Sequence, residues 1–312
     1  MVESQPQANR VLLPGSQAQG GFVGRQRELE EMRAALDDVL SGHGRIVMLT
    51  GEPGIGKTRT AQEVAVIAGQ CGCEVLWGRC YEGEGVPPYW PWAQPIRSYV
   101  QRTKTDQLLS LMGRDAVYIA QIIPDLETKL PNLEPAPALE PAQARFRLFD
   151  SISTFLKNAS QKHPLMLVLD DLHWADRSSL LLLEFIAQEI REFRLLLVGI
   201  YRDVEVSRRH PLSQTLGSLI REQSFQNIKL SGLTRQDISH FVEGTTGVTP
   251  DLTLVEAIHR QTEGNPLFVG ELVRLLSRGA LPDSYDRLGS REGSRLHRNR
   301  FIARKVSPVT NA

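Results

Sequence analysis

A glycine-rich segment at residues 51–58, Gly-Glu-Pro-Gly-Ile-Gly-Lys-Thr, constrains the fold of this chain more than any other feature. It fits the pattern G-x-x-x-x-G-K-[ST] at every defined position. The apolar run at residues 46–49 predicts a buried strand before it, and the helical spacing of apolar residues over 60–68 predicts a helix after it. Strand, glycine-rich loop and helix in this order predict an α/β fold with a parallel sheet flanked by helices.

Such a loop binds phosphate for a physical reason. Its glycines let the backbone curl, so that successive N–H groups and the positive end of the following helix point at one place. Lys57 is expected to reach the β- and γ-phosphates, and the Thr58 hydroxyl to bind magnesium. A glycine-rich turn beside an exposed lysine is the plainer alternative, and the flanking strand and helix argue against it. The residues predicted to hold the phosphates are Gly51, Glu52, Pro53, Gly54, Ile55, Gly56, Lys57 and Thr58.

Two acids follow a second apolar run, at residues 165–169. Ligands of open α/β sheets bind at the carboxyl ends of the strands, where Asp170 is expected to lie. Asp170 is therefore predicted to hold magnesium, directly or through water, and Asp171 to orient or activate an attacking water. A solvated acidic turn is the alternative reading.

Arg202 follows another apolar run, at residues 195–200, and is expected at the same edge of the sheet. A guanidinium there could detect a γ-phosphate. An exposed loop arginine is the alternative.

The remaining pattern completes the architecture. A helix is predicted over 25–40, a strand over 74–77 and a crossover helix over 178–190. No strand is predicted after about residue 231. Instead, a capping-box pattern at Thr234 and Asp237 and helical patterns over 252–261 and 266–276 predict a small helical subdomain. The predicted division of the chain is a leader at 1–20, a phosphate-binding core at 21–230, the helical subdomain at 231–280 and an Arg-rich tail at 281–312. The core contains a proline-rich insertion at 83–141 with short helices near 92–102 and 114–123.

Charge and composition exclude some classes of protein. Lys+Arg and Asp+Glu both total 36, so no overall basic field favours nucleic acid or a membrane surface. No stretch is apolar enough to cross a membrane and no secretory signal is visible, so a cytoplasmic protein without membrane partners is expected. Cys71, Cys73 and Cys80 do not have a usual zinc spacing and are expected to be reduced thiols packed around a strand.

Aromatic residues near the site admit two readings. Trp77, Tyr89, Trp90 and Trp92 could stack on a base, but aromatic residues beside prolines more often pack against a sheet, which is the favoured reading. His173, with Trp174 beside it, could line the site or cap the end of the strand.

Several motifs together resemble bacterial AAA-type ATPase domains of the STAND class, which are similar to origin-recognition ATPases. These domains form the N-terminal part of LuxR/MalT-like transcriptional regulators and of some cyclase- and kinase-linked proteins. The resemblance covers residues 22–278. Besides the glycine-rich loop, the motifs that carry it are Phe22-Val-Gly-Arg25, Leu76-Trp-Gly-Arg-Cys80, Tyr89-Trp-Pro-Trp92, Val168-Leu-Asp-Asp-Leu-His-Trp-Ala-Asp176, Val198-Gly-Ile-Tyr-Arg202 and Glu263-Gly-Asn-Pro-Leu267.

The resemblance implies roles that spacing alone does not give. Val23 and Arg25 would lie near the adenine or ribose, Pro266 would close over the base, and Arg202 would be the first sensor. ATP and Mg²⁺ are the implied cofactors, and slow hydrolysis would switch a signalling or transcription-regulatory protein between two forms. The implied partners are nucleotide, a second copy of the chain, or a separate output or DNA-binding protein. Family members usually continue into output domains, so a stand-alone domain, a truncated product and a fragment all stay open.

Other functions remain possible at this level. A DNA-binding initiator or loader could use the Arg-rich residues 283–312, although zero net charge and the lack of a recognition helix argue against direct DNA binding. A small-molecule kinase also uses a phosphate loop. A nucleotide-binding module without turnover is the third alternative.

Overall fold

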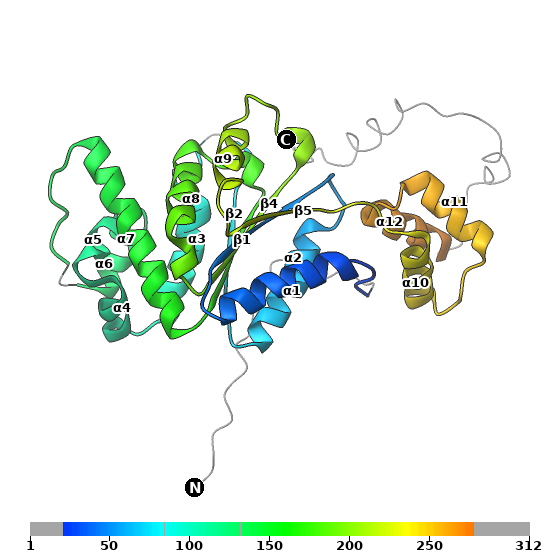
Figure 1. Ribbon diagram of the computed structural model, residues 1–312, viewed down its shortest axis with the longest axis horizontal. Coiled ribbons are helices and arrows are strands. Elements are labelled where there is room, and N and C mark those ends of the chain that lie inside the picture. Colours follow the sequence, from blue (N-terminus) through cyan, green and yellow to red (C-terminus); the bar gives the residue numbers. More distant parts are fainter. Residues whose placement is uncertain (1–20, 84, 132, 278–312) are drawn as a thin grey trace, which may run out of the picture. The chain divides into compact units, whose positions relative to one another are not determined.

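A five-stranded parallel sheet forms the centre of the molecule (Figure 1). The computed structural model describes residues 21–83, 85–131 and 133–277. The strand order is β2-β3-β4-β1-β5, so the predicted parallel sheet flanked by helices is confirmed. The strands are β1 (Arg45–Thr50), β2 (Glu74–Arg79), β3 (Leu165–Asp170), β4 (Leu195–Tyr201) and β5 (Phe225–Lys229).

The burial of each strand explains whether the sequence pattern predicted it. Every residue of β3 and β4 is buried, because helices cover both faces of the sheet. These strands are therefore the continuous apolar runs found in the sequence. The edge strand β5 was not predicted, because Ile228 is its one buried residue and no apolar run marks it.

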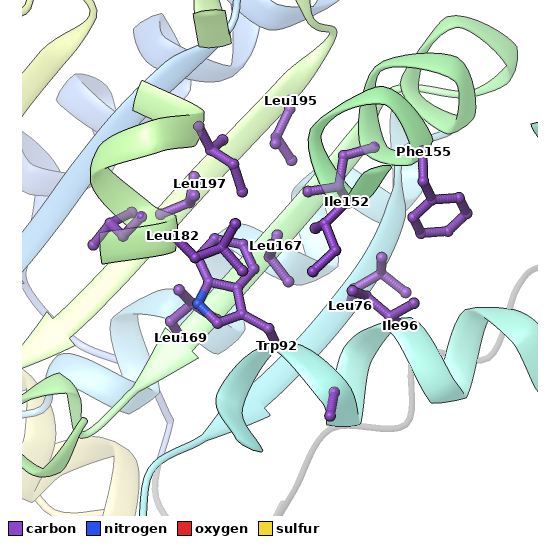
Figure 2. Close-up of a cluster of buried hydrophobic side chains, with 14 of the residues drawn as sticks. Leu76, Trp92, Ile96, Ile152, Phe155, Leu167, Leu169, Leu182, Leu195 and Leu197 are labelled. Atoms are coloured by element: carbon purple, nitrogen blue, oxygen red, sulfur yellow. The ribbon is translucent and has the colours of Figure 1, made fainter. Parts of the chain in front are cut away.

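Helices cover the sheet on both faces (Figure 1). On one face, α1 (Gln26–Leu40) and α2 (Lys57–Gln70) pack through residues such as Leu36 and Val64 against Val47 and Val198. On the other face, the side chains of Trp92, Ile152 and Leu182 meet Leu167 and Leu197 of the sheet (Figure 2). The helices that carry them are α3 (Trp90–Arg102), α7 (Pro141–Lys162) and α8 (Arg177–Glu189).

The proline-rich segment contains more helix than predicted. Beyond α3, it forms α4 (Thr105–Met112), α5 (Ala116–Ala120) and α6 (Asp125–Lys129), whereas a single helix was expected near 114–123. The start of α3 lies against β2: a side chain at Gly78 would meet the carbonyl oxygen of Pro91 at 1.8 Å. Trp92 is fully buried and its indole donates to the Ser179 carbonyl at 3.1 Å, so its predicted packing role is confirmed.

Two further details differ from the sequence prediction. The helix α9 (Pro211–Leu219) had not been expected. Phe146 continues the apolar spacing of the buried residues Phe149 and Ile152 in α7, yet it is 56% exposed and touches Phe185 edge-on. It lies in the second turn of α7, where the helix extends past its buried part.

Three helices follow the sheet: α10 (Arg235–Thr246), α11 (Leu252–Thr262) and α12 (Pro266–Ser277). The predicted capping box at Thr234 and Asp237 is present, and Asn265 accepts from the Leu267 N–H at the start of α12. The chain divides into two units, and the boundary between them, after Val269, falls within α12. The predicted leader at 1–20 and the basic segment 283–312 lie outside the described residues.

The three cysteines differ in burial. Cys73 and Cys80 are buried and Cys71 is exposed, all three as free thiols, and burial raises the pKa of Cys73 to about 11. Within the described ranges, no cluster of three or more His, Cys, Asp or Glu side chains is arranged to hold a metal ion. Across the same ranges, every helix is too short or too polar to cross a membrane.

Candidate functional site

The glycine-rich loop curls tightly between β1 and α2. Gly51, Gly54 and Gly56 all have positive φ, at 145°, 78° and 100°. A side chain at Gly51 would meet the carbonyl oxygen of Leu230 at 2.8 Å, and one at Gly54 would meet the Cβ of Leu267 at 2.9 Å. Glycine is therefore favoured at all three positions by the dihedral angles, and at Gly51 and Gly54 also by the close neighbours.

Lys57, the first residue of α2, folds its side chain back into this loop. Its ammonium donates to the carbonyls of Gly51 at 2.8 Å and Glu52 at 2.9 Å. Burial lowers the pKa of Lys57, and the nearby positive charge of Arg202 lowers it further. A buried ammonium at the start of a helix is a site prepared for an anion.

Thr58 and Asp170, the two predicted metal ligands, lie together. The Thr58 hydroxyl donates to the Asp170 carboxylate, with distances of 3.3 and 3.2 Å to its two oxygens. Asp170 ends β3 and is 3% exposed, and its carboxylate also accepts from the Asp171 N–H at 3.0 Å. Burial, with the neighbouring Asp171 charge, raises its pKa to about 6. A hydroxyl and a buried carboxylate are the hard oxygen donors that Mg²⁺ accepts, so the residues fit that ion.

Asp171 has an unexpected partner. Its Oδ2 accepts from Arg79 at 3.0 Å (Nε) and 2.9 Å (Nη2). Asp171 is in the left-handed region at φ 57°, one of the few such residues that is not glycine. Arg79 ends β2 and lies opposite Asp170 in the β2–β3 register. The sequence prediction gave Arg79 no role, because only the pairing of β2 with β3 brings it to this carboxylate.

Arg202 directly follows β4, as predicted, and its guanidinium already has partners within the chain. Its guanidinium donates to Glu205 at 2.7 Å and lies over the ring of Trp174, 5.1 Å from the centroid. Thr50 pairs with Tyr201 in the β1–β4 register, so Arg202 and the loop that starts at Gly51 follow the same edge of the sheet. The detection of a γ-phosphate remains a prediction for this residue.

His173 is turned inward, toward the acids. Its side chain is fully buried, and its Nε2 lies 3.4 Å from Glu205 and 3.9 Å from Asp171. Of the two alternatives left open, lining the site is the one supported by this position. Glu205, like Arg79, was missed, because an acid in the short helix after β4 (Asp203–Glu205) carries no motif.

The N-terminal segment contacts the loop through Arg25. Its guanidinium donates to the Ile55 carbonyl at 2.9 Å and pairs with Glu28 at 3.3 Å. Arg25 is buried and Val23 is half-buried. Arg25 therefore supports the loop backbone in this structure, and contact of Val23 and Arg25 with adenine or ribose stays a prediction.

Residues at the start of α12 contact the tip of the loop. The Asn265 amide donates to the Pro53 carbonyl at 3.0 Å, and the Leu267 N–H donates to the Gly54 carbonyl at 3.3 Å. Pro266 lies 3.9 Å from where a side chain on Gly56 would be. These contacts bring Pro266 to the loop, while its closure over a base stays a prediction.

The other aromatic residues have structural partners. Trp77 packs against the core on the α2 side of the sheet, and Trp90 lies under the guanidinium of Arg97 at 5.6 Å. Tyr89 contacts Phe149 edge-on. These contacts support the packing reading over a base-stacking cage.

Known proteins resemble this chain in sequence or in fold. An uncharacterized protein of Rhizobium meliloti (strain 1021) is 23% identical over 278 residues, which are 85% of this chain and 26% of the relative. A signal transduction ATPase with numerous domains (STAND) from Pyrococcus horikoshii, with a tetratricopeptide repeat sensor, is similar in fold at a TM-score of 0.50 and 15% identity. The match covers 86% of this chain and 31% of that protein. The Drosophila ORC structure bound to DNA has a TM-score of 0.49 at 14% identity, over 99% of this chain and 71% of that one.

This chain thus spans about a quarter to a third of the length of the first two relatives. Residues 21–198 match the family described as the AAA ATPase domain, a segment that contains the glycine-rich loop and both acids after β3. The sheet order, the curled loop and this match lead to one conclusion: the chain belongs to the AAA ATPase domain family.

Proposed function

We propose that this domain binds Mg-ATP, hydrolyses it slowly and acts as a switch in a signalling or transcription-regulatory system. The contact between Thr58 and Asp170, directly beside the curled loop that holds Lys57, is the observation that carries the proposal. It supports a metal site beside a phosphate site. Thr58 in the first turn of α2 and Asp170 at the end of β3 are far apart in the sequence and meet there.

Binding rests on the loop. Its N–H groups and the N-terminus of α2 would hold the phosphates, and Lys57 would exchange two neutral carbonyl partners for phosphate oxygens. Thr58 and Asp170 would hold Mg²⁺, which when bound neutralises charge on the β- and γ-phosphates. Arg25 and the 265–267 segment would keep the loop in its curled form, since they contact its carbonyls.

Hydrolysis and sensing rest on the strand ends. Asp171 would accept a proton from, or orient, the attacking water. Arg202 would leave Glu205 to bind the γ-phosphate, because a phosphate offers a guanidinium more charge than one carboxylate does. ATP and ADP would then differ in the contacts they make, which is what a switch requires.

The regulated process is inferred from the relatives. The Pyrococcus horikoshii protein is described as a signal transduction ATPase, and this chain covers under a third of it. A separate output protein, a DNA-binding protein or a second copy of this chain would then receive the change of state.

One experiment tests the switch directly. Equilibrium titration with Mg-ATP and Mg-ADP, together with phosphate release without any added acceptor, should show tighter binding of ATP and slow turnover. Arg202→Ala should remove most of the preference for ATP, a loss of about tenfold for one guanidinium–phosphate contact. Arg208→Ala, an exposed arginine in the following loop, is the matched control.

The result can contradict the proposal in two ways. If the protein fails to bind Mg-ATP, the nucleotide assignment is wrong. If ATP and ADP bind equally well in the parent protein, the switch is wrong even though the nucleotide site stands.

A further inference from the structure

A chain of charged groups connects the ends of three strands around His173. Arg79 from β2 binds Oδ2 of Asp171, and Arg202 after β4 binds Oε1 of Glu205. The oxygens left over are Oδ1 of Asp171 and Oε2 of Glu205. Both of these face the same atom, Nε2 of His173, at 3.9 Å and 3.4 Å.

The imidazole itself has no settled partner. Neither ring nitrogen of His173 makes a hydrogen bond to any group in the described part of the chain, although the side chain is fully buried. Leaving a buried donor unsatisfied is costly, so the ring has to engage one of the two carboxylates. Because Nε2 lies between Asp171 and Glu205, a small movement of either side chain decides which carboxylate accepts the hydrogen bond.

The charge state of the ring fits this picture. Burial lowers the pKa of His173; the carboxylates of Glu205 and Asp171 act in the opposite direction, and Arg202 and Lys57 lower it further. A neutral imidazole has one N–H to donate. The centroid of the Trp174 ring lies 4.6 Å from the centroid of the imidazole. Of the two ring nitrogens, Nε2 is the one that lies near carboxylate oxygens.

We propose that His173 is a positioning residue for hydrolysis, donating its Nε2–H either to Asp171 or to Glu205 according to whether Arg202 is bound to Glu205 or to the γ-phosphate. This inference rests on the proposed function. When Arg202 leaves Glu205, that carboxylate loses its cation and takes the imidazole N–H. Oδ1 of Asp171 is then free to accept a hydrogen from the attacking water. No proton changes owner in this exchange, since one hydrogen bond replaces another.

Three variants test the inference in the full chain. His173→Leu removes the donor at similar bulk, so Oδ1 of Asp171 is free throughout the cycle. It should raise kcat about threefold while KM for ATP stays within about twofold, because the phosphates are held by residues 51–58. His173→Gln offers an amide N–H in the same region and should return kcat to about the parent value. A merely structural role for His173 would lower the melting temperature without raising kcat.

Glu205→Gln supplies the independent arm, because its side chain is 35% exposed and the exchange preserves shape. It should lower kcat about tenfold, because a neutral amide competes poorly for the imidazole N–H and Oδ1 of Asp171 stays occupied. Combining it with His173→Leu should abolish that loss, since the donor that occupies Oδ1 is gone. His43→Leu, an exposed histidine at the opposite ends of the strands, is the control. Melting temperature and Mg-ATP affinity identify any variant that does not fold.

The possible outcomes distinguish a failure of the role of His173 from a failure of the proposed Mg-ATP switch. Failure of the parent to bind Mg-ATP overturns the proposed function. Binding with equal kcat in parent, His173→Leu and Glu205→Gln overturns the role of His173 alone, as does a parent that binds without turnover. A fall in kcat in His173→Leu, or a double variant as slow as Glu205→Gln, would also overturn the coupling. Should His173→Leu not fold, equal kcat in the parent, His173→Gln and Glu205→Gln would still overturn it.

Discussion

The two halves of the site are assembled from the chain in different ways. The loop half, residues 51–58, is one continuous stretch between β1 and α2, and its contacts are largely fixed by its own sequence. The strand-end half gathers Arg79, Asp171, His173 and Arg202 from the ends of β2, β3 and β4. In the first half the motif specifies the geometry, whereas in the second the sheet order does.

This difference suggests a division of labour. The loop half would determine whether nucleotide binds, and the strand-end half would determine what happens to it afterwards. Substitutions in the first should therefore change affinity, and substitutions in the second should change turnover. Four measurements can break or sharpen that distinction.

Loss of Lys57 should have the largest effect. Lys57→Ala removes the ammonium that the loop carbonyls now hold, so Mg-ATP affinity should fall by about 100-fold or more, as expected for a buried charge-assisted contact to phosphate. Equilibrium titration measures it. Arg59→Ala, two residues along α2 and paired with Glu63, is the control for changing charge on the same helix. Unchanged affinity in Lys57→Ala would remove the loop half from binding.

Asp171→Asn should act on turnover alone. The amide can keep the left-handed backbone of Asp171 but cannot accept a proton, so kcat should fall about 100-fold with little change in affinity. Single-turnover phosphate release measures the rate. Equal rates in variant and parent would remove Asp171 from the mechanism, and weaker binding would contradict the division between the two halves.

Asp170 provides a prediction for stability against pH. In the folded protein its pKa is raised from the ordinary 3.8 of an aspartate to about 6, so the stability it contributes when protonated is present below pH about 4 and is lost as pH rises through 6. Without magnesium, Asp170→Asn should be more stable than the parent at pH 8 by on the order of 2 kcal/mol, with the difference closing towards pH 4. Urea unfolding at several pH values measures it, with Asp106→Asn, an exposed acid of α4, as control. A difference that does not change with pH would contradict the burial argument.

Arg79→Gln should have the smallest effect. It releases Oδ2 of Asp171 from its guanidinium partner, and the freed carboxylate should raise basal phosphate release by about fivefold, since a held acceptor is a poorer base. Arg97→Gln, which breaks a surface pair with Asp125, is the matched control. A fall in the rate would instead mean that Arg79 aims the acid.

The sequence was informative wherever contacts are local or burial is continuous. Short sequence patterns predicted the strands β1, β3 and β4 and the helices α1 and α2. They also predicted the capping box at Thr234. The edge strand β5 did not, because a strand with one buried side chain has no periodicity to detect. The helices α4 and α6 were not predicted, because helices of eight and five residues give few repeats of the apolar spacing.

The same distinction holds for the site. Lys57, Thr58 and Asp170 could be placed because each belongs to a pattern or ends an apolar strand. Arg79 and Glu205 could not, since each gains its partner only from the order of neighbouring strands or from a short turn. Nothing in the spacing of these residues along the chain encodes that proximity.

The crowding around the glycines has a consequence for reading related sequences. At Gly51 a side chain would strike the chain leaving β5, and at Gly54 it would strike the start of α12. Selection for packing alone would preserve both residues in a descendant that had given up nucleotide. A relative that keeps these two glycines therefore says little about ATP. The residues it has at the positions of Lys57 and Asp170, which packing does not require, show whether it can still bind nucleotide.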